Sequence, residues 1–101
     1  MWLFAMFDLP VRTREERKCY TEFRNELIRD GFTMVQFSVY ARYCPGEQAS
    51  EAHRRRIRRA LPPEGHVRLL SVTDRQFGKM GVYRGGKCTS PEDTPTQLML
   101  F

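Results

Sequence analysis

The stretch that decides the fold is MWLFAMFD, residues 1–8, in which every side chain before Asp8 is apolar. A short apolar run that is closed by a turn signal is typical of a β-strand buried on both faces. Leu9 and Pro10 follow at once, and proline cannot continue a central strand because it has no amide hydrogen for the ladder. The sequence therefore predicts a central strand that ends at an acid.

The segment after this strand has the pattern of an amphipathic helix. Thr13 and Glu16 match a capping box, in which each side chain accepts a hydrogen bond from the other residue's backbone amide. Apolar side chains then recur at helical spacing, and charged side chains fill the other positions. Gly31 is a good helix stop, so we expect a helix of about 17 residues.

Two further segments predict a pair of strands and a second helix. Residues 32–44 are rich in aromatic and β-branched side chains but too long for one typical strand. We therefore expect two strands with a tight turn or bulge near residues 36–38. Residues 47–61 predict a helix with a narrow buried face of alanines and Ile57, which ends before Pro62.

The remaining sequence predicts two strands and a tail. Residues 67–73 have the composition of a fourth strand, and residues 77–83 that of a short fifth. Residues 85–96 have a linker composition. The largely apolar tail at residues 97–101 is expected to dock on a sheet edge or a partner, because a free apolar terminus promotes aggregation. The domain itself then spans residues 1–84.

The predicted order of elements, β-α-β-β-α-β, is the ferredoxin-like arrangement, an α+β fold with an antiparallel sheet and both helices on one face. The first strand is nevertheless apolar on both faces. Its alternate positions give one row of Leu3, Ala5 and Phe7 and an opposite row of Trp2, Phe4 and Met6. The second row must be covered, and the most economical cover is a second copy of the chain. We therefore expect a homodimer through the sheet face, with Asp8 near its rim.

The charge of the chain favours nucleic acid over a membrane as its partner. Lys and Arg number 17 against 12 Asp and Glu, a formal net charge of +5 at pH 7, which suits a polyanion. The longest apolar run, residues 1–7, is far short of the roughly 20 residues that a spanning helix needs. No basic segment precedes that run, as one would in a signal peptide.

Cysteine and histidine give no sign of a disulfide framework or a zinc site. Cys19, Cys44 and Cys88 are odd in number and widely spaced, and no C-x-x-C motif occurs. Neither His53 nor His66 has a second ligand at metal-binding spacing. The simplest interpretation is three reduced thiols in a cytoplasmic protein.

Asp8 is the first candidate for chemistry. A carboxylate at a strand end is a hard oxygen ligand for Mg²⁺ or Mn²⁺, and two copies across a two-fold axis could share one ion that polarises a phosphodiester and activates water. The alternative is structural, with Asp8 capping the turn at Leu9 and Pro10 or pairing with an arginine. Asp74, which also follows a predicted strand, is assigned to a turn.

The arginines form two groups. Arg12, Arg14 and Arg17 follow Asp8 closely. Their planar guanidinium groups can bind phosphate oxygens. Plain exposure to solvent explains these three arginines as well. A denser group lies in the second predicted helix: Arg54, Arg55, Arg56, Arg58 and Arg59. Phosphate binding and plain solvation near a helix C-terminus both remain open for this group. No aromatic residue is interleaved with it, which disfavours stacking on single strands.

The aromatic residues near the predicted hairpin have a structural interpretation. Phe37 and Tyr40 belong to the aromatic, β-branched segment that forms the second and third strands. Their spacing does not match the signature of an RNA-recognition sheet. We therefore expect both side chains in the core or in an interface.

Three features together resemble a known family. An apolar first strand that closes in F-D-L-P at residues 7–10, a basic helix start, and S-V-Y at residues 38–40 opening a strand are similar to CRISPR-associated protein 2. That protein is the small partner of the CRISPR spacer integrase. The length matches, and the similarity runs over residues 1–83. The tail at residues 97–101 resembles the extension of members from systems with a single large RNA-guided nuclease.

The resemblance implies a ferredoxin-like homodimer in complex with two dimers of the CRISPR-associated protein 1 integrase. The small dimer would hold the middle of a duplex protospacer DNA before its insertion into the repeat array. The resemblance also implies a Mg²⁺- or Mn²⁺-dependent endonuclease acting on RNA or DNA, with Asp8 as its catalytic, metal-binding residue. Arg12 and Arg14 carry over as nucleic-acid-binding residues. Two alternatives stay open: a stand-alone, toxin-like endoribonuclease of related fold, and an adaptor with no nucleic-acid role.

Overall fold

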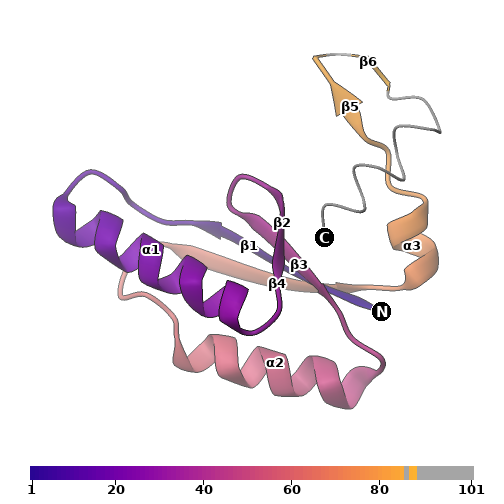
Figure 1. Ribbon diagram of the computed structural model, residues 1–101, viewed down its shortest axis with the longest axis horizontal. Helices are drawn as coiled ribbons and strands as arrows, with labels where there is room; N and C mark the ends of the chain where they lie inside the picture. The colour runs from indigo at the N-terminus through magenta and orange to yellow at the C-terminus, as the bar shows by residue number, and fades with distance from the viewer. Residues whose placement is uncertain (86, 89–101) are drawn as a thin grey trace.

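The computed structural model describes residues 1–85, 87 and 88 and has the predicted ferredoxin-like arrangement (Figure 1). Four strands form one antiparallel sheet in the order β2-β3-β1-β4. Their bounds are β1 Trp2–Asp8, β2 Thr33–Gln36, β3 Val39–Tyr43 and β4 His66–Val72. The helices are α1 Arg14–Arg29, α2 Glu47–Arg59 and α3 Asp74–Gly78, and a separate two-stranded ribbon pairs β5 Tyr83–Arg84 with β6 Lys87–Cys88.

The central strand β1 carries the core. It pairs antiparallel with β3 on one side and with β4 on the other. Its row of Leu3, Ala5 and Phe7 is buried, and Leu3 and Ala5 are 0% exposed. The helical side chains that close this layer are Phe23 and Leu27 of α1 and Ile57 of α2. Both helices therefore cover the same face of the sheet, as expected (Figure 1).

The opposite face of β1 is covered in part by the chain itself. The ring of Phe77, from α3, stacks on Trp2 with centroids 4.3 Å apart and lies 5.8 Å from the ring of Phe4. Met80 packs against the same cluster. Part of the cover that was expected from a second copy thus comes from α3 and the residues after it. Leu70, which β4 places opposite Phe4, remains 50% exposed.

The fifth strand predicted at residues 77–83 is wrong in its position: residues 77 and 78 end the helix α3, and the next strand, β5, begins at Tyr83. Thr73 caps the helix: its hydroxyl accepts from the Gln76 amide at 3.1 Å, and Gln76 Oε1 accepts from the Thr73 amide at 2.8 Å. This capping box outweighs the strand-like composition that follows it. Asp74, predicted in a turn, is the first residue of α3.

The second helix differs from its prediction at its end and on its buried face. It ends two residues early, because the residue before Pro62 avoids the helical conformation. Its buried side chains are Ser50, His53 and Ile57 rather than alanines. Polar groups can be buried when they find partners, and Ser50 Oγ lies 3.4 Å from Ser71 Oγ.

The turn predicted near residues 36–38 is confirmed. Ser38 has a φ of +63°, and a register irregularity lies between Met34 and Gln36. The Phe7 amide donates to the Ser38 carbonyl oxygen at 3.0 Å. The tip of the β2–β3 hairpin is therefore bonded to the end of β1.

Part of the predicted linker and the tail lie outside the described residues. The described part of residues 85–96 is Gly85 and β6, and the apolar residues 97–101 are not described. Among the residues that are described, no helix is both long and apolar enough to cross a membrane.

Gly65 packs the turn before β4 against the end of β1, and this contact can be tested. Its φ is +93°, and an added Cβ would lie 2.6 Å from the Asp8 carbonyl oxygen. We predict that Gly65→Ala lowers the free energy of unfolding, measured with urea, by about 2 kcal/mol or more, since the left-handed conformation alone costs about 1–2 kcal/mol. At Gly78 an added Cβ meets nothing within 4 Å. Gly78→Ala should therefore change stability by less than about 0.5 kcal/mol, and equal effects of the two substitutions would contradict this account.

Candidate nucleic-acid and metal site

Asp8 is the last residue of β1 and lies on the face of the sheet that α1 and α2 leave open. It continues the row of Phe4 and Met6, and the strand register places it opposite His66. Its side chain is exposed. Within residues 1–85, 87 and 88 its carboxylate has no hydrogen-bond or ion-pair partner. The structure therefore leaves this carboxylate available and does not use it as a turn cap or as the partner of an arginine.

Two basic side chains share the open face with Asp8. His66 is directly opposite Asp8 on β4, and Arg68 is opposite Met6. Both are exposed. Directly opposed residues in antiparallel strands have Cβ atoms about 4.5–5.5 Å apart. His66 is therefore a neighbour of Asp8 that sequence reasoning missed, because only the register of β1 and β4 brings the two together.

Arg12 and Arg14 occupy the start of α1, after the loop that follows Asp8. Both are exposed, and Arg14 is the first residue of the helix. The Arg12 backbone amide donates to Glu16 Oε1 at 2.9 Å. Arg17 has a different position: its Nη1 donates to the carbonyl oxygens of Val11 and Arg12 at 3.2 and 3.1 Å. Arg17 thus holds the loop, while the guanidinium groups of Arg12 and Arg14 have no partner in the described part of the chain.

One copy of the chain has few side chains at this site that could hold a metal ion. In the described part of the chain, no group of three His, Cys, Asp or Glu side chains is placed to hold an ion. Mg²⁺ does not require such a cage, because it commonly binds one or two carboxylates together with water and substrate phosphate. The exposed, unpaired carboxylate of Asp8 fits that donor set.

Most arginines of α2 are held by other side chains. The pairs are Arg54 with Ser71 at 2.8 Å, Arg56 with Asp30 at 2.8 Å and Arg58 with Glu51 at 3.2 Å. Arg55 and Arg59 are exposed and have no such partner among the described residues. Because α2 covers the helical face of the sheet, this group is not part of the Asp8 site.

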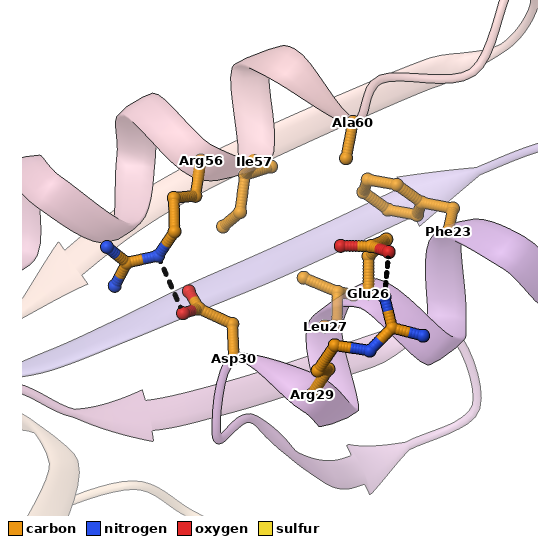
Figure 2. Close-up of a pocket in the computed structure, with 8 residues that line it drawn as sticks. All are labelled: Phe23, Glu26, Leu27, Arg29, Asp30, Arg56, Ile57 and Ala60. Atoms are coloured by element: carbon orange, nitrogen blue, oxygen red, sulfur yellow. Dashed lines mark hydrogen bonds and ion pairs between the residues drawn. The ribbon is translucent and has the colours of Figure 1, made fainter.

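A cleft of about 140 Å³ lies between α1 and α2 (Figure 2). Its apolar lining consists of Phe23, Leu27, Ile57 and Ala60. At its rim the carboxylate of Asp30 pairs with Arg56 and lies 2.7 Å from His53 Nδ1. Arg42 Nη1 donates to the Asp30 carbonyl oxygen at 2.6 Å. These groups satisfy one another, so the cluster is a structural junction and not an open catalytic site.

Cys44 is not suited to act as a nucleophile. Cys19 and Cys44 are both free. Cys44 is 0% exposed, and burial raises the pKa of its thiol although Arg42 acts in the opposite direction. A buried thiol with a raised pKa supplies little thiolate.

The two aromatic residues expected in the core or an interface have different environments. Tyr40 is 1% exposed, and its hydroxyl accepts from Arg24 Nε at 2.8 Å. Phe37 is 79% exposed at the tip of the β2–β3 hairpin. The prediction of a core position is confirmed for Tyr40. Phe37 is not in the core, and its expected place in an interface stays a prediction.

The chain is similar in sequence to the proteins of one known family. A family model described as CRISPR associated protein Cas2 matches residues 1–80. A protein of Parvibaculum lavamentivorans named CRISPR-associated endoribonuclease Cas2 is 48% identical over 101 residues and is covered, like this chain, over 100% of its length. Proteins of the same name from Flavobacterium psychrophilum and Campylobacter jejuni are 44% and 39% identical, with 100% of this chain matched and 88% and 71% of those proteins covered.

Proposed function

The chain belongs to the CRISPR-associated protein Cas2 family, and on this premise we propose that it is a nucleic-acid-binding subunit of a CRISPR adaptation complex with a metal-dependent endonuclease activity at Asp8. The observation that carries the proposal is the exposed carboxylate of Asp8, at the end of a buried strand on the open face of the sheet, which has no partner among the described residues. The name endoribonuclease that the relatives bear supports RNA as the first substrate to test.

The metal in this proposal is Mg²⁺ or Mn²⁺. Asp8 is the residue that would hold it, and Asp8 of a two-fold related copy would supply a second carboxylate. When bound, such an ion polarises a phosphodiester and activates water. The contribution of the chain is to fix the carboxylate: Asp8 is paired with β4 through His66, and Gly65 is packed against its carbonyl oxygen.

The arginines after β1 bind the phosphate backbone in this proposal. Arg12 and Arg14 are exposed, and their guanidinium groups can donate paired hydrogen bonds to phosphate oxygens. Arg17 is a positioning residue, because its hydrogen bonds to the carbonyl oxygens of the preceding loop fix the approach to the helix. Backbone contacts of this kind bind without reading sequence.

The open sheet face is the proposed dimer interface. Leu70 is 50% exposed on this face, beside the nearly buried Phe4. Pairing two such faces would remove the apolar side chains from water and bring the two Asp8 carboxylates to one rim. The family membership supports duplex protospacer DNA and dimers of the CRISPR-associated protein 1 integrase as further partners, in the cytoplasm.

The competing function is a stand-alone, toxin-like endoribonuclease. It would use the same Asp8 and the same dimer, so the structure of one chain does not separate the two. They differ in partners: the adaptation subunit requires duplex binding and co-purification with the integrase, and the toxin-like enzyme requires neither. Duplex binding is therefore measured separately from cleavage in the experiments below.

Asp8→Asn keeps the shape of the side chain and removes its charge. We expect it to reduce cleavage of RNA, or of DNA if that is the substrate, by at least about a hundredfold, as EDTA should in the parent protein. Duplex binding in EDTA should persist. Asp74→Asn is the matched control, because Asp74 follows β4 and pairs with the Met1 amino group at 2.7 Å. Unchanged cleavage by the pure Asp8→Asn dimer would assign the activity elsewhere.

Arg12→Ala and Arg14→Ala should each weaken duplex binding. Each lost phosphate contact is expected to reduce the slope of log K against log salt concentration by about 1, measured by fluorescence anisotropy over a salt series. Arg29→Ala is the control, since Arg29 lies at the other end of α1 and pairs with Glu26. A salt slope that is the same in all of these variants would argue against the assignment.

Leu70→Lys should raise the dissociation constant of the dimer, because it places a charge on the apolar face. Analytical ultracentrifugation over a concentration series measures the shift towards monomer. The fold of the monomer should persist in circular dichroism, since Leu70 is half exposed in one chain. Leu61→Lys is matched in exposure, at 48%, and lies outside this face. The interface is misplaced if both variants dimerise like the parent.

A further inference from the structure

An exposed aromatic pair lies on the helical side of the fold, whereas Asp8 belongs to the row on the open side of the sheet. The ring of Phe37 stacks on that of Tyr20 with centroids 6.0 Å apart and an interplanar angle of 19°. Tyr20 belongs to α1 and packs against the core, while Phe37 is 79% exposed. One face of the Phe37 ring thus lies on Tyr20. An isolated exposed apolar side chain is ordinary, so the way in which this pair is held matters more than its exposure.

Several contacts fix the pair in place. The hydroxyl groups of Tyr20 and Ser38 are hydrogen-bonded at 3.1 Å, next to the residue that presents its ring to solvent. The Ser38 carbonyl oxygen accepts from the Phe7 amide at 3.0 Å, and the rings of Phe7 and Tyr20 lie 5.6 Å apart. A ligand that stacks on Phe37 therefore meets a platform whose conformation is already ordered, which lowers the entropic cost of binding.

Positive charge flanks this platform. Arg17 lies three residues before Tyr20 on α1 and Arg24 four residues after it, spacings that place all three on one side of the helix. Each arginine uses one nitrogen for an internal hydrogen bond, and a guanidinium carries further N–H donors. Glu16, the acid in the same row, is occupied by the capping box. The surroundings of the ring pair therefore suit an anion.

We propose that Phe37 and Tyr20, with Arg17 and Arg24, form a second nucleic-acid site that stacks an unpaired base of a single strand. Stacking on an aromatic ring requires a base whose face is free, which the interior of a duplex does not offer, and the arginines suit the adjoining phosphates. The site rests on the proposed nucleic-acid role but not on the chemistry of Asp8. Arg17, Tyr20 and Arg24 come from α1, and the β2–β3 hairpin adds Phe37 to them.

Fluorescence tests the stacking directly. Phe37→Trp keeps a ring at the platform and adds an exposed indole, and its emission is compared with that of the parent, whose only tryptophan is Trp2. In EDTA, a short oligodeoxythymidine or oligouridine should quench the added emission. The control ligand is a DNA duplex closed at both ends by abasic linkers, which has no unpaired base. It should not quench the added emission. Equal quenching by this duplex would overturn the proposal.

Affinity measurements complete the test. Phe37→Ala should weaken binding of the labelled single strand about tenfold and leave duplex binding unchanged. Tyr43→Ala is the matched control, because Tyr43 is also an exposed aromatic residue, at 48%, but is packed on Trp2. The proposal fails if Phe37→Ala binds both ligands like the parent. It also fails if Phe37→Ala changes only the oligomeric state, since the ring is then a contact between copies.

The outcome is separable from that of the proposed function. Asp8→Asn should retain quenching in the Phe37→Trp background, because the two sites lie on opposite sides of the sheet. Cleavage at Asp8 without quenching would overturn the stacking site alone. Quenching by a single strand without any cleavage would support the stacking site and count against the endonuclease.

Discussion

The pairing of β1 with both β3 and β4 is the constraint on which the rest of the structure depends. Leu3 and Ala5 are completely buried at its centre, and every other layer is placed relative to this strand. Because side chains alternate between faces, a slip of one residue would send the buried row to the opposite side. The same alternation that buries Leu3 therefore directs Asp8 to the open face.

The distribution of arginine separates structural from functional charge. The densest group, in α2, is largely bound to acids and hydroxyls within the chain, through pairs such as Arg56 with Asp30 and Arg58 with Glu51. Arg12 and Arg14, proposed to bind the phosphate backbone beside Asp8, have no partner for their guanidinium groups in the part of the chain that is described. A dense run of arginines in the sequence thus indicates a basic surface. It does not show which guanidinium groups are available to a ligand, since that depends on the acceptors that the fold places beside them.

The local signals in the sequence were sufficient for most elements. The apolar run that ends at Asp8, the capping box at Thr13 and the proline after α2 each act within one or two turns of chain, and the corresponding elements are present. At residues 77 and 78 two local signals compete: their composition predicts a strand, and the capping box at Thr73 starts the helix that is present.

The errors and omissions at the candidate site have a common cause, which is distance along the chain. His66 adjoins Asp8 only through strand register, and Phe37 meets Tyr20 only through the hairpin turn. The burial of His53 depends on Asp30, 23 residues earlier. Periodicity describes one element at a time, so it assigned Asp8 to the correct face but could not identify its neighbours.

The junction at Asp30 has a consequence for how this fold can change. One residue joins three elements: its carboxylate contacts His53 and Arg56 of α2, and its carbonyl oxygen accepts from Arg42 of β3. Replacing one member alone leaves the others with unsatisfied polar groups, which is costly in a partly buried setting. Substitutions at these positions are therefore strongly non-additive. As the sequence evolves, these residues are expected to change together or to be retained. A junction with no role in the chemistry thus restricts which substitutions the protein tolerates.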